Sequence, residues 1–302
     1  MIQNNIKQIQ SLQQSIQDMA EDFVIILGPT ASGKTKLAVA LAQAINAEII
    51  SADSRQVYRG MDIGTGKDIQ EYGEIPFHLI DIIDPGEKYN VTQFLADFEE
   101  AYSAIKSRGK QVIVCGGTGF YLQALLSPRP YAHIPIDLDY RASLEIMSKE
   151  EVLSLLKTKA IPSDFSVDFS SKKRMIRALE ILEWLEKNPN HTPETSAVYT
   201  AKVFGLNPAL EVRRERISQR LRARLEQGMI DEVKNLLAAG VTFEDLEYYG
   251  LEYKYISYYF QGEISYDDFV KKLETEIHRY AKRQMTYFRK MEKDGIGMNW
   301  LK

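Results

Sequence analysis

The chain is 302 residues long and carries 38 Lys and Arg against 42 Asp and Glu, a formal net charge of −4. Its composition, 44% hydrophobic and 26% charged, argues against a mostly disordered chain and allows one large domain or a core with a smaller lobe. The chain has no run of 18 apolar residues, no signal-type apolar stretch in its Gln-rich N-terminus and a single cysteine, Cys115, so we expect a cytoplasmic protein that does not associate with membranes.

The first half of the chain alternates strands and helices. Strands are predicted by the compact apolar runs FVIILG (23–28), AEIISADS (47–54), HLIDIID (78–84) and QVIVCGG (111–117). Helices are predicted over 1–20, 34–45 and 90–108, with another beginning near Gly119. This alternation predicts an α/β fold, a parallel sheet flanked by helices that presents ligands at the carboxyl ends of its strands.

After Leu126 the alternation of strands and helices ends. A Pro-rich connector, SPRPYAHIPIDLD (127–139), leads into segments that are nearly all helical, and the main helix candidates are 139–156, 171–186, 211–239 and 266–293. We therefore expect four parts: a helical N-terminal extension (1–22), an α/β core (23–127), a short helical insertion (128–170) and a helical C-terminal part (171–302) that completes the core.

A phosphate-binding loop follows the first strand and precedes a helix. The sequence GPTASGKT matches G-x-x-x-x-G-K-[ST] with Gly28, Pro29, Thr30, Ala31, Ser32, Gly33, Lys34 and Thr35. In such a loop the glycines let backbone N–H groups close around phosphate oxygens, the lysine supplies a point charge and the threonine hydroxyl ligates Mg²⁺. A chance glycine turn is the weaker alternative, so we expect a diphosphate or triphosphate at this loop.

An acid of the kind that holds Mg²⁺ in P-loop NTPases is missing from the strand QVIVCGG. Asp81 and Asp84 in HLIDIID are at least as readily turn residues as metal ligands. ATP hydrolysis is therefore not the expected activity.

The second strand ends in the segment SADSRQVY (51–58), on the same edge of the sheet as the phosphate loop. Asp53 in this segment has two interpretations of equal weight. It takes a proton from an incoming nucleophile, or it caps the following turn.

Four motifs in order, GPTASGKT, SADSRQVYRGMDIGTGK, FHLIDIIDP and GGTGFYLQALL, resemble the tRNA dimethylallyltransferase (isopentenyl-tRNA transferase) family. The resemblance resumes with RMIRALEI (174–181), RISQRLRARLEQGMIDEV (216–233) and YAKRQMTYFRK (280–290), and so covers about residues 23–290. It implies that the P-loop holds dimethylallyl diphosphate. It also implies that the dimethylallyl group passes to N6 of an adenine next to the tRNA anticodon, with release of diphosphate.

The resemblance also implies roles for individual residues. Asp53 corresponds to the group that accepts the proton of N6, and Lys34 and Thr35, with Mg²⁺ as cofactor, to the groups that neutralise the departing diphosphate. Thr118 corresponds to a position that touches the nucleotide, and Arg220 to an arginine near the pyrophosphate.

The RNA side is indicated by three basic stretches and by the motif after the second strand. The residues expected to bind tRNA are Asp53, Ser54, Arg55, Gln56, Thr118, Arg141, Lys173, Arg174, Arg177, Arg279 and Arg283. Tyr121, Tyr287 and Phe288 are candidates for stacking on an extruded base, although core packing is at least as good an interpretation of each.

The chain departs from the family pattern on this RNA side. The inserted lobe looks short, and a family Gly-Tyr-Lys turn is Glu252-Tyr253-Lys254 here. An enzyme acting on free AMP or ATP, a non-catalytic RNA-binding paralogue and a metabolite kinase therefore stay as alternatives to a monomeric tRNA-modifying enzyme.

Overall fold

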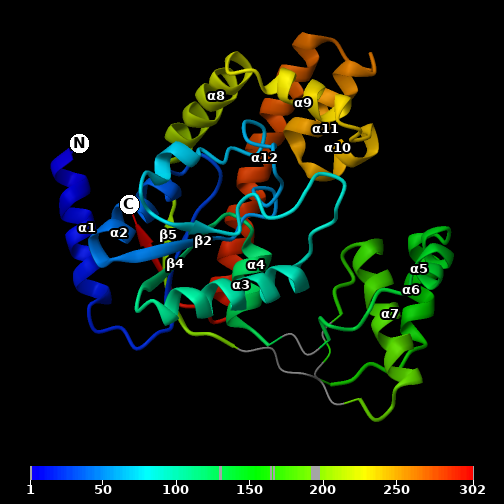
Figure 1. The fold of residues 1–302 in the computed structure, drawn as a ribbon. Coiled ribbons are helices and arrows are strands. Elements are labelled where there is room, and N and C mark those ends of the chain that lie inside the picture. Colours follow the sequence, from blue (N-terminus) through cyan, green and yellow to red (C-terminus); the bar gives the residue numbers. More distant parts are fainter. Residues whose placement is uncertain (1, 129–130, 164, 166, 192–197, 302) are drawn as a thin grey trace. The chain divides into compact units, whose positions relative to one another are not determined.

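The computed structural model describes residues 2–128, 131–163, 165, 167–191 and 198–301. The chain forms two compact units (Figure 1). The sheet unit comprises Met1–Ser127 and Val198–Lys302, and the helical unit comprises Pro128–Ala197. Among the described residues no helix combines the length and the hydropathy that crossing a membrane requires.

A six-stranded sheet forms the centre of the sheet unit. Its strands are β1 (Phe23–Leu27), β2 (Ala47–Ser51), β3 (Phe77–His78), β4 (Gln111–Gly116), β5 (Ala201–Leu206) and β6 (Met298–Leu301). They lie in the order β3-β2-β4-β1-β5-β6, and every neighbouring pair is parallel. The predicted parallel α/β sheet is confirmed, and β5 and β6 are two strands that the sequence did not predict.

Alternate residues of the central strands face opposite sides of the sheet. Ile25 and Val114 belong to the larger core. This core is covered by α3 (Val91–Ser107), α4 (Gly119–Leu126) and α12 (Tyr266–Lys293). Ile26 and Ile113 belong to a second core under α1 (Ile2–Ile16) and α2 (Lys34–Ile45). Helices therefore cover both faces, as a parallel sheet requires.

The strand predicted over 78–84 is much shorter than expected. Only Phe77–His78 pair with β2, and Leu79 and Asp81 then adopt left-handed backbone angles, with φ of 62° and 56°. A left-handed residue takes the chain out of the extended conformation that a strand needs. The segment after His78 is consequently a loop, and a short 3₁₀ helix, η1 (Ile69–Tyr72), precedes β3.

The C-terminal part of the sheet unit is helical, but one of its predicted helices is divided in two. The stretch 211–239 divides into α8 (Leu210–Glu226) and α9 (Met229–Ala238) because Gly228 takes a left-handed conformation with φ of 95°. Two helices, α10 (Phe243–Tyr249) and α11 (Leu251–Phe260), were not predicted, whereas α12 (Tyr266–Lys293) has the predicted length.

The helical unit contains α5 (Leu138–Glu145), α6 (Lys149–Lys157) and α7 (Lys172–Lys187). The single helix predicted over 139–156 breaks where Ser148 makes a capping box that starts α6. Leu144, Val152 and Leu179 bring the three helices into one core. For this reason α7 packs with the inserted helices. The helical unit therefore ends at residue 197, whereas the insertion was expected to end at residue 170. Arg129 and Pro130 of the predicted connector lie outside the described residues.

Candidate active site

The carboxyl ends of β1, β4 and β2 lie side by side and open into a cleft of about 1120 Å³. All residues that line it belong to the sheet unit. The turns after β2 and β4 are bound to each other, because the Thr118 N–H donates to the Ala52 carbonyl (3.2 Å) and the Ser54 N–H donates to Thr118 Oγ1 (3.1 Å). Gly116 has no room for a side chain, since a Cβ would lie 2.2 Å from the Ala52 carbonyl oxygen.

The phosphate loop takes left-handed backbone angles at two positions, of which one is a glycine. Ala31 and Gly33 have φ of 60° and 88°, and α2 begins directly afterwards at Lys34. Gly28 is tightly surrounded, because a Cβ would lie 2.6 Å from Ser32 Oγ and 3.2 Å from the Leu206 carbonyl oxygen. Ser32 Oγ is buried and has no hydrogen-bond partner among the described residues. Residues Gly28–Thr35, predicted to hold the diphosphate, therefore form a loop that runs into the first turn of α2, and Thr30 to Thr35 line the cleft.

Gln284 on α12 connects the two turns that flank the cleft. Its Oε1 accepts the Thr30 N–H of the phosphate loop and its Nε2 donates to the Gly117 carbonyl, both at 2.9 Å. Sequence reasoning missed this residue, although it lies in the YAKRQ motif, because its two partners are 254 and 167 positions away in the chain.

Lys34 and Thr35 stand at the start of α2 and line the cleft. Burial lowers the pKa of Lys34, and the positive charges of Arg220 and Arg224 lower it further, whereas Cys115 and Asp53 act in the opposite direction. Within the described parts of the chain neither side chain has a hydrogen-bond or ion-pair partner. Both groups are thus available to an anionic ligand.

Thr35 is also the residue predicted to bind Mg²⁺. The described residues contain no cluster of three or more His, Cys, Asp or Glu side chains that could hold a metal ion. Mg²⁺ commonly uses one or two protein oxygens and completes its shell with phosphate oxygens and water. The single hydroxyl fits an ion that arrives with a phosphate ligand, and does not fit a site built from protein groups alone.

Asp53 follows the end of β2 and lines the cleft, half-buried. Its Oδ1 accepts the Arg55 N–H at 3.0 Å, so the turn-capping interpretation describes one of its two oxygens. Oδ2 has no partner among the described residues and leaves a carboxylate oxygen for a ligand. Gln56 is used internally, since it accepts from Ser51 Oγ (3.1 Å) and donates to the Gly66 carbonyl (3.1 Å).

The opposite wall of the cleft consists of α8 and the loop of residues 59–67. Arg220 donates to Asp68 (2.7 Å) and to the Gly66 carbonyl (3.2 Å), and Arg224 lies 3.5 Å from the Gly64 carbonyl. A Cβ on Gly66 would lie 1.5 Å from the guanidinium of Arg224. The glycines of this loop therefore let two arginines lie against backbone, with Lys34 in the same cleft.

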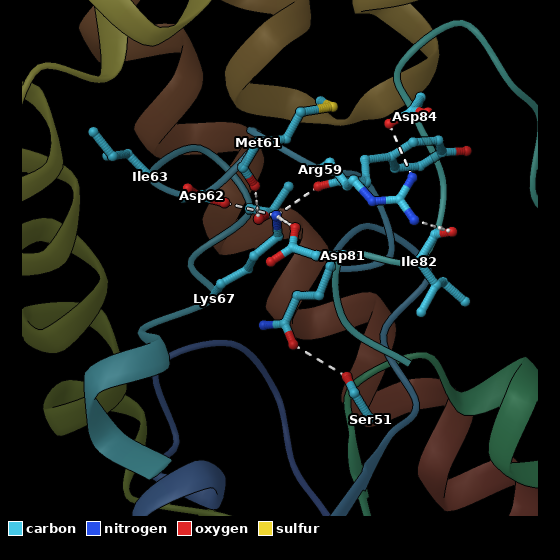
Figure 2. Close-up of polar contacts among 12 residues, drawn as sticks. Ser51, Arg59, Met61, Asp62, Ile63, Lys67, Asp81, Ile82 and Asp84 are labelled. Carbon is cyan, nitrogen blue, oxygen red and sulfur yellow. Dashed lines mark hydrogen bonds and ion pairs between the residues drawn. The ribbon is translucent and has the colours of Figure 1, made fainter. Parts of the chain in front are cut away.

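This loop is held in place by Lys67, which is fully buried (Figure 2). Its Nζ donates to the Tyr58 carbonyl, to Asp62 (2.7 Å) and to Asp81. The lysine of the GTGK motif consequently does not line the cleft. Asp81, whose role as a turn residue was one sequence interpretation, serves as its counter-ion.

Glu232 on α9 binds the same loop from another side. Its carboxylate accepts the backbone N–H groups of Asp62, Ile63 and Gly64 at 2.7–3.0 Å and the Tyr253 hydroxyl at 2.7 Å. Three N–H groups that would otherwise need solvent are satisfied at once. The sequence offered no signal for this contact, which joins residues about 170 positions apart.

Aromatic residues at the cleft differ from those proposed for stacking. Tyr121 and Phe288 are buried in the core, as their alternative interpretation held. Tyr248 and Tyr280, which the sequence did not single out, line the cleft. The Arg55 guanidinium lies 4.9 Å from the centroid of the Tyr248 ring, a cation–π contact.

The predicted tRNA-binding residues of α12 share one acid. Arg279 and Arg283 both pair with Glu276, and both are exposed. Arg283 also lines the cleft, whereas Arg279 does not. One positive charge of the pair is therefore left over for a polyanion, and the assignment stays a prediction.

The predicted tRNA-binding residues of the helical unit divide into two kinds. Arg141 makes a two-pronged contact to the buried Glu180 (2.9 and 2.6 Å), and Arg177 donates to the Ile134 carbonyl and faces the same acid. Lys173 is exposed, and Arg174 is paired with Asp168 at the surface (2.7 Å). Only the second kind presents its charge to solvent.

Comparisons with known proteins agree with this geometry. The family model described as IPP transferase matches residues 56–291, and that described as Isopentenyl transferase matches 21–74. The chain is 46% identical over 284 residues to tRNA dimethylallyltransferase 1 of Geotalea uraniireducens, covering 94% of this chain and 93% of that protein. It is 47% identical to tRNA dimethylallyltransferase 2 of Bacteroides fragilis, covering 93% and 92%.

Solved structures give the same result. The full-length tRNA isopentenylpyrophosphate transferase of Bacillus halodurans is 34% identical, with a TM-score of 0.67 and coverage of 93% of this chain and 89% of that one. A eukaryotic dimethylallyltransferase acting on tRNA is 25% identical, with a TM-score of 0.73 and coverage of 93% and 74%.

Proposed function

The chain belongs to the tRNA dimethylallyltransferase (IPP transferase) family, and we propose that it transfers the dimethylallyl group of dimethylallyl diphosphate to N6 of an adenine next to the anticodon of tRNA, releasing diphosphate. One observation carries the assignment of roles. The cleft is lined by a phosphate loop and by Asp53, and among the described residues neither the Lys34 amine nor one of the two Asp53 carboxylate oxygens has a partner.

The leaving group is assigned to the phosphate loop and the opposite wall. An allylic diphosphate departs only if the charge that grows on its oxygens is neutralised. We propose that Lys34, the loop amides and Arg220 bind these oxygens, with Thr35 holding Mg²⁺. When bound, Mg²⁺ supplies further positive charge to the diphosphate.

The acceptor is assigned to the turns after β2 and β4. The N6 amine of adenine is a weak nucleophile because its lone pair is delocalised into the ring. We propose that Asp53 accepts a hydrogen bond from N6 and takes up its proton as the C–N bond forms, which typically contributes about 10²–10⁴-fold. Thr118 is held against the Ser54 N–H and contacts the nucleotide from the other side.

We propose that the enzyme acts as a monomer in the cytoplasm, since every residue assigned a role in transfer lies in the sheet unit of one chain. Purified protein with dimethylallyl diphosphate and unmodified tRNA should yield N6-dimethylallyladenosine in the digested nucleosides, measured by mass spectrometry. Free AMP offered in place of tRNA should stay unmodified. Modification of AMP alone would reassign the enzyme to free nucleotides.

A further inference from the structure

An acidic side chain lies inside the basic wall of the cleft. Glu252 is the second residue of α11 and lines the cleft. Its side chain is 17% exposed, and its Oε1 lies 3.6 Å from Nη1 of Arg224, whose side chain is 10% exposed. Neither the donor nor the acceptor chemistry described above uses this carboxylate.

Two other cations that line the cleft, Arg220 and Lys34, have no buried acid as a partner among the described residues. Arg220 is paired with Asp68, whose side chain is 47% exposed and therefore screened by water. Lys34 has no acidic partner within the described chain. Glu252 is thus a largely buried acid beside Arg224, in a cleft that Arg220 and Lys34 also line, and charges interact most strongly where water is excluded.

The contact between Glu252 and Arg224 is an ion pair without a hydrogen bond, because 3.6 Å exceeds hydrogen-bonding distance. Arg224 is instead held by the close fit of its guanidinium against Gly66 and by the Gly64 carbonyl. Burial and Arg220 lower the pKa of Arg224 to about 10, and burial raises the pKa of Glu252. Both shifts are those of charges that have lost water and gained little hydrogen bonding in return.

A diphosphate in the cleft and the Glu252 carboxylate would be two anions competing for the same guanidinium. We propose that Glu252 is a positioning residue that balances the charge of Arg224 in the empty enzyme and weakens the hold of the cleft on diphosphate, so that the product leaves after transfer. The proposal rests on the proposed function, since it requires that the cleft binds a diphosphate.

The test compares two glutamine variants that change the net charge equally. Glu252→Gln removes the buried anion with almost no change in shape. Glu247→Gln is the matched control, because Glu247 also lines the cleft but is 41% exposed and pairs with Lys254 (2.9 Å). Binding of inorganic pyrophosphate with Mg²⁺ is measured by calorimetry, and transfer to tRNA is measured in single-turnover and steady-state experiments.

Glu252→Gln should bind pyrophosphate about tenfold more tightly, a difference of about 1.4 kcal/mol. Pyrophosphate should also become a stronger product inhibitor and steady-state kcat should fall, whereas the single-turnover rate stays within about twofold of wild type. Glu247→Gln should match wild type in all three. Weaker pyrophosphate binding by Glu252→Gln, or equal changes in both variants, would overturn the proposal.

Two further measurements distinguish a failure of this proposal from misfolding of a variant and from a failure of the proposed function. Thermal melting checks that each variant is folded, and Glu252→Ala should shift pyrophosphate binding in the same direction if the glutamine variant proves unstable. Failure of the wild type to modify tRNA would refute the proposed function. The effect of Glu252 on pyrophosphate binding would still decide the present proposal.

Discussion

Basic residues of α8 and of the helical unit look alike in the sequence and differ in what surrounds them. On α8, Arg220 and Arg224 line a cleft of about 1120 Å³ and touch backbone carbonyls of the loop beside them. In the helical unit, Arg141 and Arg177 are turned onto one buried acid, Glu180. A run of arginines in the sequence therefore shows that positive charge is present. How much of that charge a ligand can use depends on the acids that lie nearest to the arginines in the structure.

The largest expected effect is on the rate of transfer in the cleft, the first of these two regions. Asp53→Asn retains an oxygen to accept the Arg55 N–H and removes the proton acceptor. Single-turnover transfer should fall by about 10²–10⁴-fold, whereas donor affinity and melting temperature should stay near wild type. A variant that transfers at the wild-type rate would remove Asp53 from the mechanism.

The second effect concerns stability in the helical unit. Glu180→Gln leaves Arg141 and Arg177 without their buried counter-ion, and breaking such a pair costs about 3–5 kcal/mol. Chemical denaturation followed by circular dichroism should show this loss, while donor binding in the sheet unit stays unchanged.

Glu183→Gln is the matched control for this variant. Glu183 pairs with Lys159 and Lys187 and is 27% exposed, so the same substitution should cost about 0–1 kcal/mol. Equal losses in the two variants would show that Glu180 has no special place in the unit.

The third effect is a pH dependence in the cleft. Burial lowers the pKa of Lys34, so the charge that binds the diphosphate is lost as the pH rises, at a lower pH than an ordinary lysine would require. Donor affinity measured by calorimetry should fall in this alkaline range. In Lys34→Arg the fall should move to higher pH, because a guanidinium holds its proton more tightly than an amine at the same position; an unchanged profile would assign the titration to another group.

The smallest effect concerns the exposed arginines of α12. Reversing both Arg279 and Arg283 to Glu should weaken tRNA binding and reduce the slope of log affinity against log salt by about 1, since one charge of the pair is left over and each phosphate contact contributes about 0.7–0.9. Donor affinity should not change by more than about twofold, although Arg283 borders the cleft. Lys234→Glu, at an exposed lysine of α9 that pairs with Asp231, is the control and should leave the slope unaltered.

Prediction from sequence succeeded where the signal is local. The apolar runs at 23–28 and 111–117 became β1 and β4, and GPTASGKT lies between a strand and a helix as its pattern requires. It failed at β6 and at α11, because a four-residue edge strand and a Tyr-rich helix carry weak periodicity of their own. The strand expected after His78 was lost to left-handed residues, which no composition rule indicates.

The sequence by itself determined the parallel sheet, the phosphate loop and the acid after the second strand, because each depends on residues that are neighbours in the chain. The tertiary structure decided which charges are available. Glu180 neutralises Arg141 across 39 positions, Gln284 joins two turns across 167, and Lys67 of the GTGK motif is buried against Asp81. Ion pairing and burial depend on distance in space, and helix packing brings together side chains whose separation along the chain carries no such information.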